Sequence, residues 1–244
     1  MREYLAFRLY GPMSAWGDIA VGETRPSYIH PSKSAVMGMI AAALGITRDK
    51  ESDHKRLADD YGFAVQTLSF GTPLTDYHTA QVPPSGTGKN RKIFSTRKDE
   101  LAAPRDELKT ILSRRDYRMD SLFIATLWIR NSPPYKPLKD IKEKLKKPDY
   151  TLYLGRKSCP LALPLEPQIV TANNMREAFS LAKFKCYPGE LGAVNCRRDF
   201  FWEDSDDAGM ELQDVFIRRD VPLSRKRWQF DTRKEYHASF STGG

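Results

Sequence analysis

The stretch from Pro31 to Gly45 constrains this fold most, because it predicts a helix that only a protein core can hold. Ser32 or Ser34 can cap its start, and Gly45 is placed to end it. Its large side chains are apolar and most of the others are small, so no face of the helix is strongly polar. The sequence therefore predicts a buried helix packed closely against a sheet.

The start of this predicted helix also suggests an anion site. Its first backbone N–H groups have no partner within the helix, and Lys33 lies among them, with Arg25 a few residues upstream. Helix N-termini favour negative charge, so we expect Arg25, Lys33 and Ser34 to contact phosphate. A plain core helix whose cap lies near two surface cations is the alternative.

Strand patterns surround this helix. Residues 4–10 and 63–70 alternate, which predicts a strand on each side of it and one βαβ unit. Residues 121–130 are apolar on both faces and predict a central strand, followed by a helix from Pro137. Residues 165–171 predict an edge strand, because Pro167 cannot donate to a neighbour.

Two successive βαβ units predict an α+β, ferredoxin-like domain with the plan of the RNA-recognition module. We assign it to residues 1–171, with a smaller, mostly β C-terminal region over residues 172–244. In that region we expect a short helix at 174–183 and a final strand near 227–230. The aromatic platform motif of the RNA-recognition module is absent.

Residues 72–120 separate the two units and are too many for a turn. Tyr77 and Thr79 alternate as in a strand, and residues 92–96 can pair back, which predicts a protruding β-hairpin followed by a short helix near 106–113. A disordered basic loop is the alternative.

The composition favours a polyanionic partner, because the net charge is +8. The three cysteines form no CxxC pair, which favours a reducing compartment and no zinc site. No signal peptide or membrane-spanning run is visible, so we expect a cytoplasmic protein without a membrane partner. Residues 86–89 resemble a phosphate-binding loop but lack its spacing, so we expect no nucleotide hydrolysis and no cofactor.

Tyr77 and His78 raise the possibility of metal-free RNA cleavage. That reaction needs a base with a pKa near neutrality and a cation that holds the phosphate. His78 and Tyr77, with Lys89 or Lys92 as the cation, supply those residue types. A structural or RNA-stacking role is the more frequent use of such a pair.

Residues 150–160 have the composition of a backbone clamp. Gly155 permits close approach, Arg156 and Lys157 neutralise phosphates, Ser158 donates a hydrogen bond, and Tyr153 offers an aromatic ring. A simple turn after a helix is the alternative.

At these residues the sequence resembles the CasD branch of the Cas-five family of CRISPR-associated proteins. The matching segments fall in the same order as in the family and span most of the first 165 residues. They are Gly11–Gly17, Thr24–Pro26, Pro31–Asp49, Asp76–Thr79, Arg115–Tyr117 and Tyr150–Leu161. Farther on, Arg219–Pro222 and Trp228 match loosely. The segment Pro83–Lys92 departs from the family as an insert.

The resemblance implies a non-catalytic RNA-binding subunit of the type I-E surveillance complex, Cascade, with a RAMP palm and the hairpin at 72–120 as a thumb. Such subunits cap the 5′ handle of the CRISPR RNA, contact the backbone subunit CasC and the large subunit CasA, and meet target DNA within the assembled complex. The implied handle-binding residues are Trp16, Arg25, Lys33, Ser34, Tyr77, His78, Tyr153, Gly155, Arg156, Lys157 and Ser158. A CRISPR RNA-processing endoribonuclease, the role of a type I-C relative, is the second hypothesis, and a generic RNA-binding module is the third.

Overall fold

The structure is a computed structural model that describes residues 1–83, 94–102, 106–185, 197–203, 208–224, 227 and 229–241. The helices are α1 (Lys33–Ala43), α2 (Glu51–Asp60), α3 (Arg97–Glu100), α4 (Leu138–Lys146) and α5 (Met175–Leu181). The strands are β1 (Arg2–Tyr10), β2 (Met13–Ser14), β3 (Thr24–Arg25), β4 (Tyr61–Ser69), β5 (Thr72–Val82), β6 (Lys109–Met119), β7 (Leu122–Ile129), β8 (Gln168–Ala172), β9 (Arg197–Trp202), β10 (Asp214–Ser224) and β11 (Gln229–Ser241).

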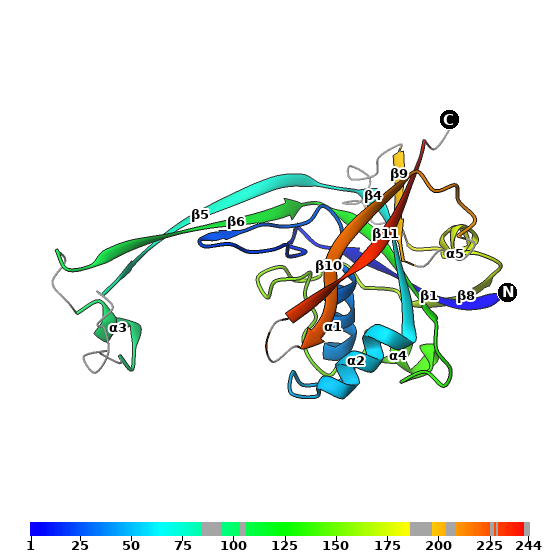
Figure 1. The fold of residues 1–244 in the computed structure, drawn as a ribbon, viewed down its shortest axis with the longest axis horizontal. Coiled ribbons are helices and arrows are strands. Elements are labelled where there is room, and N and C mark those ends of the chain that lie inside the picture. The colour runs from blue at the N-terminus through cyan, green and yellow to red at the C-terminus, as the bar shows by residue number, and fades with distance from the viewer. Residues whose placement is uncertain are drawn as a thin grey trace.

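The main sheet has seven strands in the order β10-β11-β9-β4-β7-β1-β8, and every neighbouring pair is antiparallel. The predicted strands at residues 4–10, 63–70 and 121–130 are confirmed as β1, β4 and β7. β8 lies at an edge of the sheet, as Pro167 indicated. Helices α1 and α2 connect β1 to β4, and α4 connects β7 to β8 (Figure 1).

The predicted buried helix is confirmed as α1. Ser32 is its N-cap, accepting a hydrogen bond from the Ala35 N–H at 3.2 Å, and Gly45 follows its end with a φ of 72°. The core on the α1 side of the sheet is built from α1, α4 and alternate residues of β1, β4 and β7. A second, smaller core lies on the opposite face, beneath α5.

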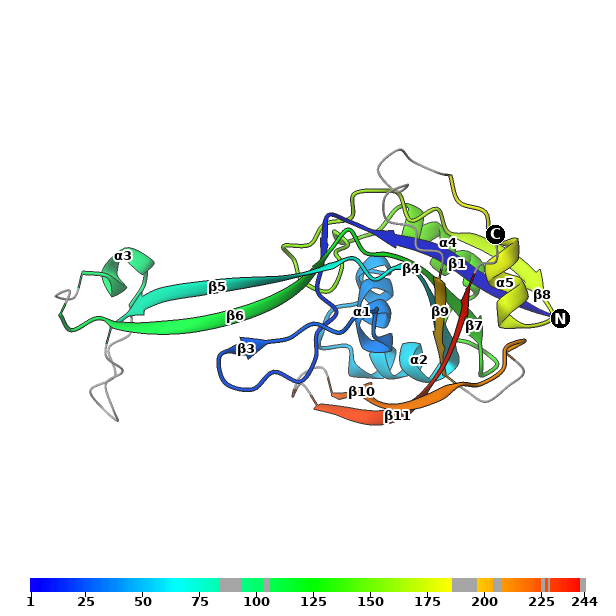
Figure 2. The ribbon, with the colours of Figure 1, turned by 90° about the horizontal axis from the view of Figure 1, so that it is seen from above.

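β5 and β6 pair along their whole lengths and project from the body as a long hairpin with α3 at its outer end (Figures 1 and 2). The protruding hairpin was predicted, but its details were wrong. Residues 109–119, rather than 92–96, return along the first strand, and the short helix is α3, not residues 106–113. Thr96 and Asp99 form a capping box that starts a helix there, and residues 92 and 93 lie outside the described part.

The C-terminal strands extend the same sheet. β9 and β10 were not predicted, and β11 is longer than the final strand expected at residues 227–230. The sheet curves so that β10 passes beside α1 and α2, with β11 paired to it (Figure 2). The predicted helix at 174–183 is confirmed as α5. None of the helices in the described ranges has the length and apolar character needed to cross a bilayer.

Candidate nucleic-acid interface

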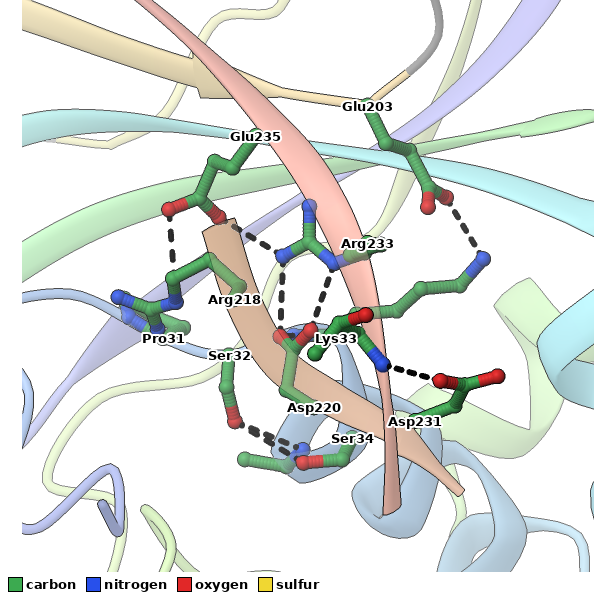
Figure 3. Close-up of polar contacts among 12 residues, drawn as sticks. Pro31, Ser32, Lys33, Ser34, Glu203, Arg218, Asp220, Asp231, Arg233 and Glu235 are labelled. Atoms are coloured by element: carbon green, nitrogen blue, oxygen red, sulfur yellow. Dashed lines mark hydrogen bonds and ion pairs between the residues drawn. The ribbon is translucent and has the colours of Figure 1, made fainter. Parts of the chain in front are cut away.

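The predicted phosphate site at the start of α1 is already filled by the protein's own carboxylates. The Lys33 backbone N–H donates to Asp220 Oδ2 at 2.8 Å, and Lys33 Nζ lies 2.7 Å from Glu203 Oε1 (Figure 3). Burial lowers the pKa of Lys33, whose ammonium also donates to the Tyr61 carbonyl oxygen. Lys33 is only 2% exposed and is paired within the protein, so its charge is not offered at the surface, and the contact of Lys33 with RNA stays a prediction.

Lys33 belongs to a buried group of charges that we call the ion cluster: Lys33, Arg218 and Arg233 with Glu203, Asp220 and Glu235. Arg233 contacts Asp220 through two nitrogens, at 2.7 and 2.9 Å, and also lies 2.7 Å from Glu235 (Figure 3). Arg218 and His30 lie 3.5 and 3.2 Å from Glu235. These contacts connect β10 and β11 to α1, which gives the cluster a structural role.

Ser34 lies next to the cap, where its Oγ is 3.2 Å from Ser32 Oγ. Its side chain is half-buried and borders two cavities beside α1. Trp16 is almost fully buried, with its ring edge-on to Phe123 at a centroid distance of 5.8 Å. Trp16 therefore offers no ring face on the outer surface, although it lines the cavity that Ser34 borders.

A second set of cations lies where the hairpin joins the body. β3 runs parallel to β6 there, so that Arg25 pairs with Arg115 and Thr24 with Arg114. Asp76 of β5 lies opposite Arg115 on its other side. Paired residues share a face of a sheet, so Arg25, Arg115 and Asp76 line one face of this region.

Arg156, which belongs to the predicted backbone clamp, also lies at the base of the hairpin. It donates to the carbonyl oxygens of Asp116 at 3.0 Å and Arg25 at 2.7 Å, and its guanidinium lies 4.7 Å from the centre of the Tyr117 ring. We call Arg25, Arg114, Arg115, Arg156 and Lys157 the hairpin-base cations. Arg25, Arg114, Arg115 and Lys157 are exposed, and Arg156 is half-buried.

Gly155 is required by the fold itself, whereas its predicted contact with RNA stays a prediction. Its φ is 84°, and a Cβ there would lie 1.8 Å from the Ala15 carbonyl oxygen. Only glycine fits, but its close neighbour is residue 15 of this chain. The backbone is held there, since the Ala15 N–H donates to the Leu154 carbonyl oxygen at 3.0 Å. Tyr153 is half-buried and Ser158 is exposed beside this turn.

Tyr77 and His78 do not lie together in the structure, although they are adjacent in the sequence. The two are neighbours in β5, so their side chains point to opposite faces of the hairpin. His78 Nδ1 lies 2.7 Å from Asp76 Oδ2, while Tyr77 lies opposite Arg114. Lys92, a cation of the cleavage hypothesis, lies outside the described residues. Within the described ranges, no three His, Cys, Asp or Glu residues gather as a metal site would require.

Arg114 and Arg115 were not among the predicted site residues. They become neighbours of Arg25 through the pairing of β3 with β6, which joins segments some ninety positions apart in the sequence. A two-residue parallel bridge leaves no periodic pattern in the sequence. Two adjacent arginines within a strand were the one local signal that could have suggested a basic surface.

Comparisons with known proteins give the family. Residues 4–236 match the CRISPR-associated protein (Cas5) family. The chain is 30% identical over 246 residues to the CRISPR system Cascade subunit CasD of Escherichia coli (strain K12), covering 97% of this chain and 96% of the relative. A chain of a solved CRISPR RNA-guided surveillance complex is 25% identical, with a TM-score of 0.67 and coverage of 98% and 90%. A crystal structure of a Cas protein shares the fold at 20% identity, with a TM-score of 0.62 and coverage of 98% and 95%. This chain belongs to the Cas5 family of CRISPR-associated proteins.

Proposed function

We propose that this chain is a non-catalytic, RNA-binding subunit of a type I-E CRISPR surveillance complex, in which it caps the 5′ handle of the CRISPR RNA. The observation that carries the proposal is the gathering of Arg25, Arg115 and Arg156 at the hairpin base. The similarity to a Cascade subunit over nearly the whole chain supports the same role.

The chemistry of the hairpin base suits a ribose-phosphate backbone. Arg25 donates to the carbonyl oxygens of Gly22 and Thr24, and Arg156 donates to those of Asp116 and Arg25. A carbonyl orients a guanidinium without cancelling its positive charge, so the cations still attract phosphate. Phosphate contacts position a nucleic acid regardless of its sequence, and they make binding depend on salt.

The fold supports the palm-and-thumb arrangement of the proposal. The strand order β4-β7-β1-β8, with helices between β1 and β4 and between β7 and β8, supports a ferredoxin-like (RRM-like, RAMP) domain over residues 1–171, with residues 172–244 completing the fold. We assign the thumb to residues 72–120. Its exposed apolar side chains, Leu74, Ile111 and Leu112, support a contact with an adjacent protein subunit.

We infer that the neighbours in the complex are the backbone subunit CasC and the large subunit CasA, and that target DNA is met only after assembly. The proposed location is the cytoplasm, where the CRISPR RNA is available.

The test is the affinity of the purified full chain for a synthetic handle RNA across a salt series. Arg25→Ala and Arg115→Ala should each weaken binding. Each should also make the slope of log affinity against log salt concentration less steep, by the amount that corresponds to about one phosphate contact. Lys139→Ala, at an exposed position on α4, is the matched control and should leave both quantities unchanged. If the affinity of the wild type does not change with salt concentration, the proposal is contradicted.

The competing function is cleavage of CRISPR RNA. One observation favours it: Asp76 is placed to orient His78, as a carboxylate orients a catalytic histidine. General acid–base catalysis contributes about two to four orders of magnitude in rate, so a catalytic His78 is easy to detect. We expect no site-specific cleavage of labelled repeat RNA in EDTA, by either the wild type or His78→Ala. Cleavage that disappears in the variant would favour the nuclease.

A further inference from the structure

A carboxylate lies among the cations at the base of the hairpin. Asp76 of β5, Arg115 of β6 and Arg25 of β3 are paired in one row across three adjacent strands (Figure 2). Paired side chains point to the same face of a sheet, and the Cβ atoms of directly opposite residues in antiparallel strands are about 4.5–5.5 Å apart. The row therefore presents two positive charges followed by a negative one.

The negative charge of Asp76 is not compensated by these arginines. Among the described residues, the side chain of Arg115 makes no ion pair or hydrogen bond, and Arg25 donates to carbonyl oxygens. The only hydrogen bond that the described residues give to the Asp76 carboxylate comes from His78 Nδ1, which lies 2.7 Å from Oδ2. Oδ1 keeps its capacity to accept, and the Asp76 side chain is 37% exposed, so a ligand can reach the carboxylate.

The hydrogen bond with His78 fixes the direction of the carboxylate. Asp76 and His78 are two positions apart in β5, so both side chains lie on the face that carries Arg115. An ionised carboxylate only accepts hydrogen bonds, so Nδ1 of the imidazole carries the proton in this contact. An acceptor that is oriented before the ligand arrives loses less conformational entropy on binding.

A carboxylate in a phosphate site has an electrostatic cost. Asp76 repels the phosphates that Arg25 and Arg115 attract, and so lowers the affinity for any nucleic acid that brings no hydrogen-bond donor to it. The ribose 2′-hydroxyl is a donor, and it is the group by which a protein distinguishes RNA from DNA. In an RNA strand, each 2′-hydroxyl lies close to a phosphate of the same backbone. A phosphate held by Arg115 can therefore place a 2′-hydroxyl at the next position in the row, which is Asp76.

We propose that Asp76 gives this site its preference for RNA over DNA, by accepting a hydrogen bond from one ribose 2′-hydroxyl of the bound strand. Arg115 and Arg25 hold the adjacent phosphate. This inference rests on the proposed function, which itself requires only phosphate contacts, and those contacts are common to RNA and DNA.

The test measures the affinity of the full chain for handle RNA and for handles that each carry a 2′-deoxyribose at one position. In the wild type, one such position should weaken binding by about tenfold, because a hydrogen bond to a charged acceptor is lost. In Asp76→Ala, deoxyribose at that position should have no further effect, because both changes delete the same contact. Asp76→Asn keeps an acceptor oxygen and should retain part of the effect.

A second measurement uses DNA with the sequence of the handle. Asp76→Ala should strengthen binding of the DNA, because a repulsive charge is removed, while it weakens binding of the RNA. If Asp76 served only to support the hairpin, its removal would change both affinities in the same direction. Asp116→Ala is the matched control, because it removes a carboxylate from the opposite face of β6. It should leave the effect of each single deoxyribose unchanged.

The outcomes distinguish this inference from the proposed function. If Arg25→Ala weakens binding of the RNA, but every single deoxyribose has the same effect in the wild type and in Asp76→Ala, the role of Asp76 is wrong and the proposed function stands. If the wild type does not bind handle RNA, both are wrong.

Discussion

Two regions of this molecule are rich in cations, and they differ in what surrounds the charges. In the ion cluster, Lys33 and Arg218 are 2% and 5% exposed, the side chain of Arg233 is 8% exposed, and all three lie against carboxylates. At the hairpin base, Arg25, Arg114 and Arg115 are exposed. Residue type alone therefore does not identify a phosphate site. Burial and the carboxylates that the fold brings near each cation decide which charges are compensated within the protein and which stay at the surface.

The partners explain the contrast. In the ion cluster, Glu203, Asp220 and Glu235 compensate the buried positive charges directly. At the hairpin base, Arg156 donates to backbone carbonyl oxygens, which hold it without neutralising it. The ion cluster thus joins parts of the fold, while the hairpin base keeps positive charge at the surface, although Arg114 Nε lies 3.4 Å from Asp116 Oδ1 there.

The largest effect is expected from Arg233→Ala. Its removal leaves Asp220 and Glu235 buried beside less positive charge, and breaking a buried ion pair in this way costs about 3–5 kcal/mol. We expect that loss in the free energy of unfolding measured with urea. Arg114→Ala, in the exposed set, should change it by only about 0.5 kcal/mol. Equal effects of the two substitutions would remove the distinction between the regions.

The ion cluster should also give the protein a steep loss of stability in acid. Burial opposes the charge of Glu235, but His30, Arg233 and Arg218 outweigh it and lower its pKa from 4.5 to about 2. A carboxyl whose pKa is lower in the folded state stabilises fully above the unfolded pKa, and this contribution disappears as the pH falls through the folded pKa.

Glu235 should therefore contribute roughly 3 kcal/mol above pH 5, most of which is lost on approaching pH 2. Urea unfolding of the wild type and of Glu235→Gln between pH 6 and pH 3 measures it. The variant is less stable at neutral pH, but its stability should fall less steeply toward acid. Parallel curves for the two proteins would mean that Glu235 does not hold this charge.

The sequence predicted the buried helix, the main strands of the first 171 residues and the protruding hairpin, because each has a local pattern. It assigned Lys33 to RNA because the compensating residues, Glu203 and Asp220, lie near or in β9 and β10, which carry no clear alternation. It missed Arg115 because the bridge between β3 and β6 is only two residues long. Local periodicity predicts elements, whereas the partners of a charge depend on contacts between distant segments.

A smaller effect, in RNA binding, distinguishes the two cation sets directly. Lys33→Met removes a buried charge, while Arg115→Ala removes an exposed one at the hairpin base. We expect Arg115→Ala to weaken handle binding by about tenfold at low salt and to flatten the salt dependence. Lys33→Met should keep the wild-type salt slope, with its effect confined to stability. If Lys33→Met also reduces the slope of log affinity against log salt concentration, Lys33 takes part in RNA binding.

The smallest effect on stability is expected from the outer end of the hairpin. α3 has no buried residue, and Arg97 contacts only Glu100 and the Gln81 carbonyl oxygen among the contacts described for it. Replacing residues 83–108 by an Asn-Gly turn keeps the pairing of β5 with β6. The shorter connection also lowers the entropy cost of closing the hairpin, by a small amount. The free energy of unfolding should change by less than about 1 kcal/mol. Binding of the isolated handle should also persist, because Arg25, Arg115 and Arg156 remain. A loss of several kcal/mol would mean that the outer segment packs on the body, and lost handle binding would move the RNA site outward from the hairpin base.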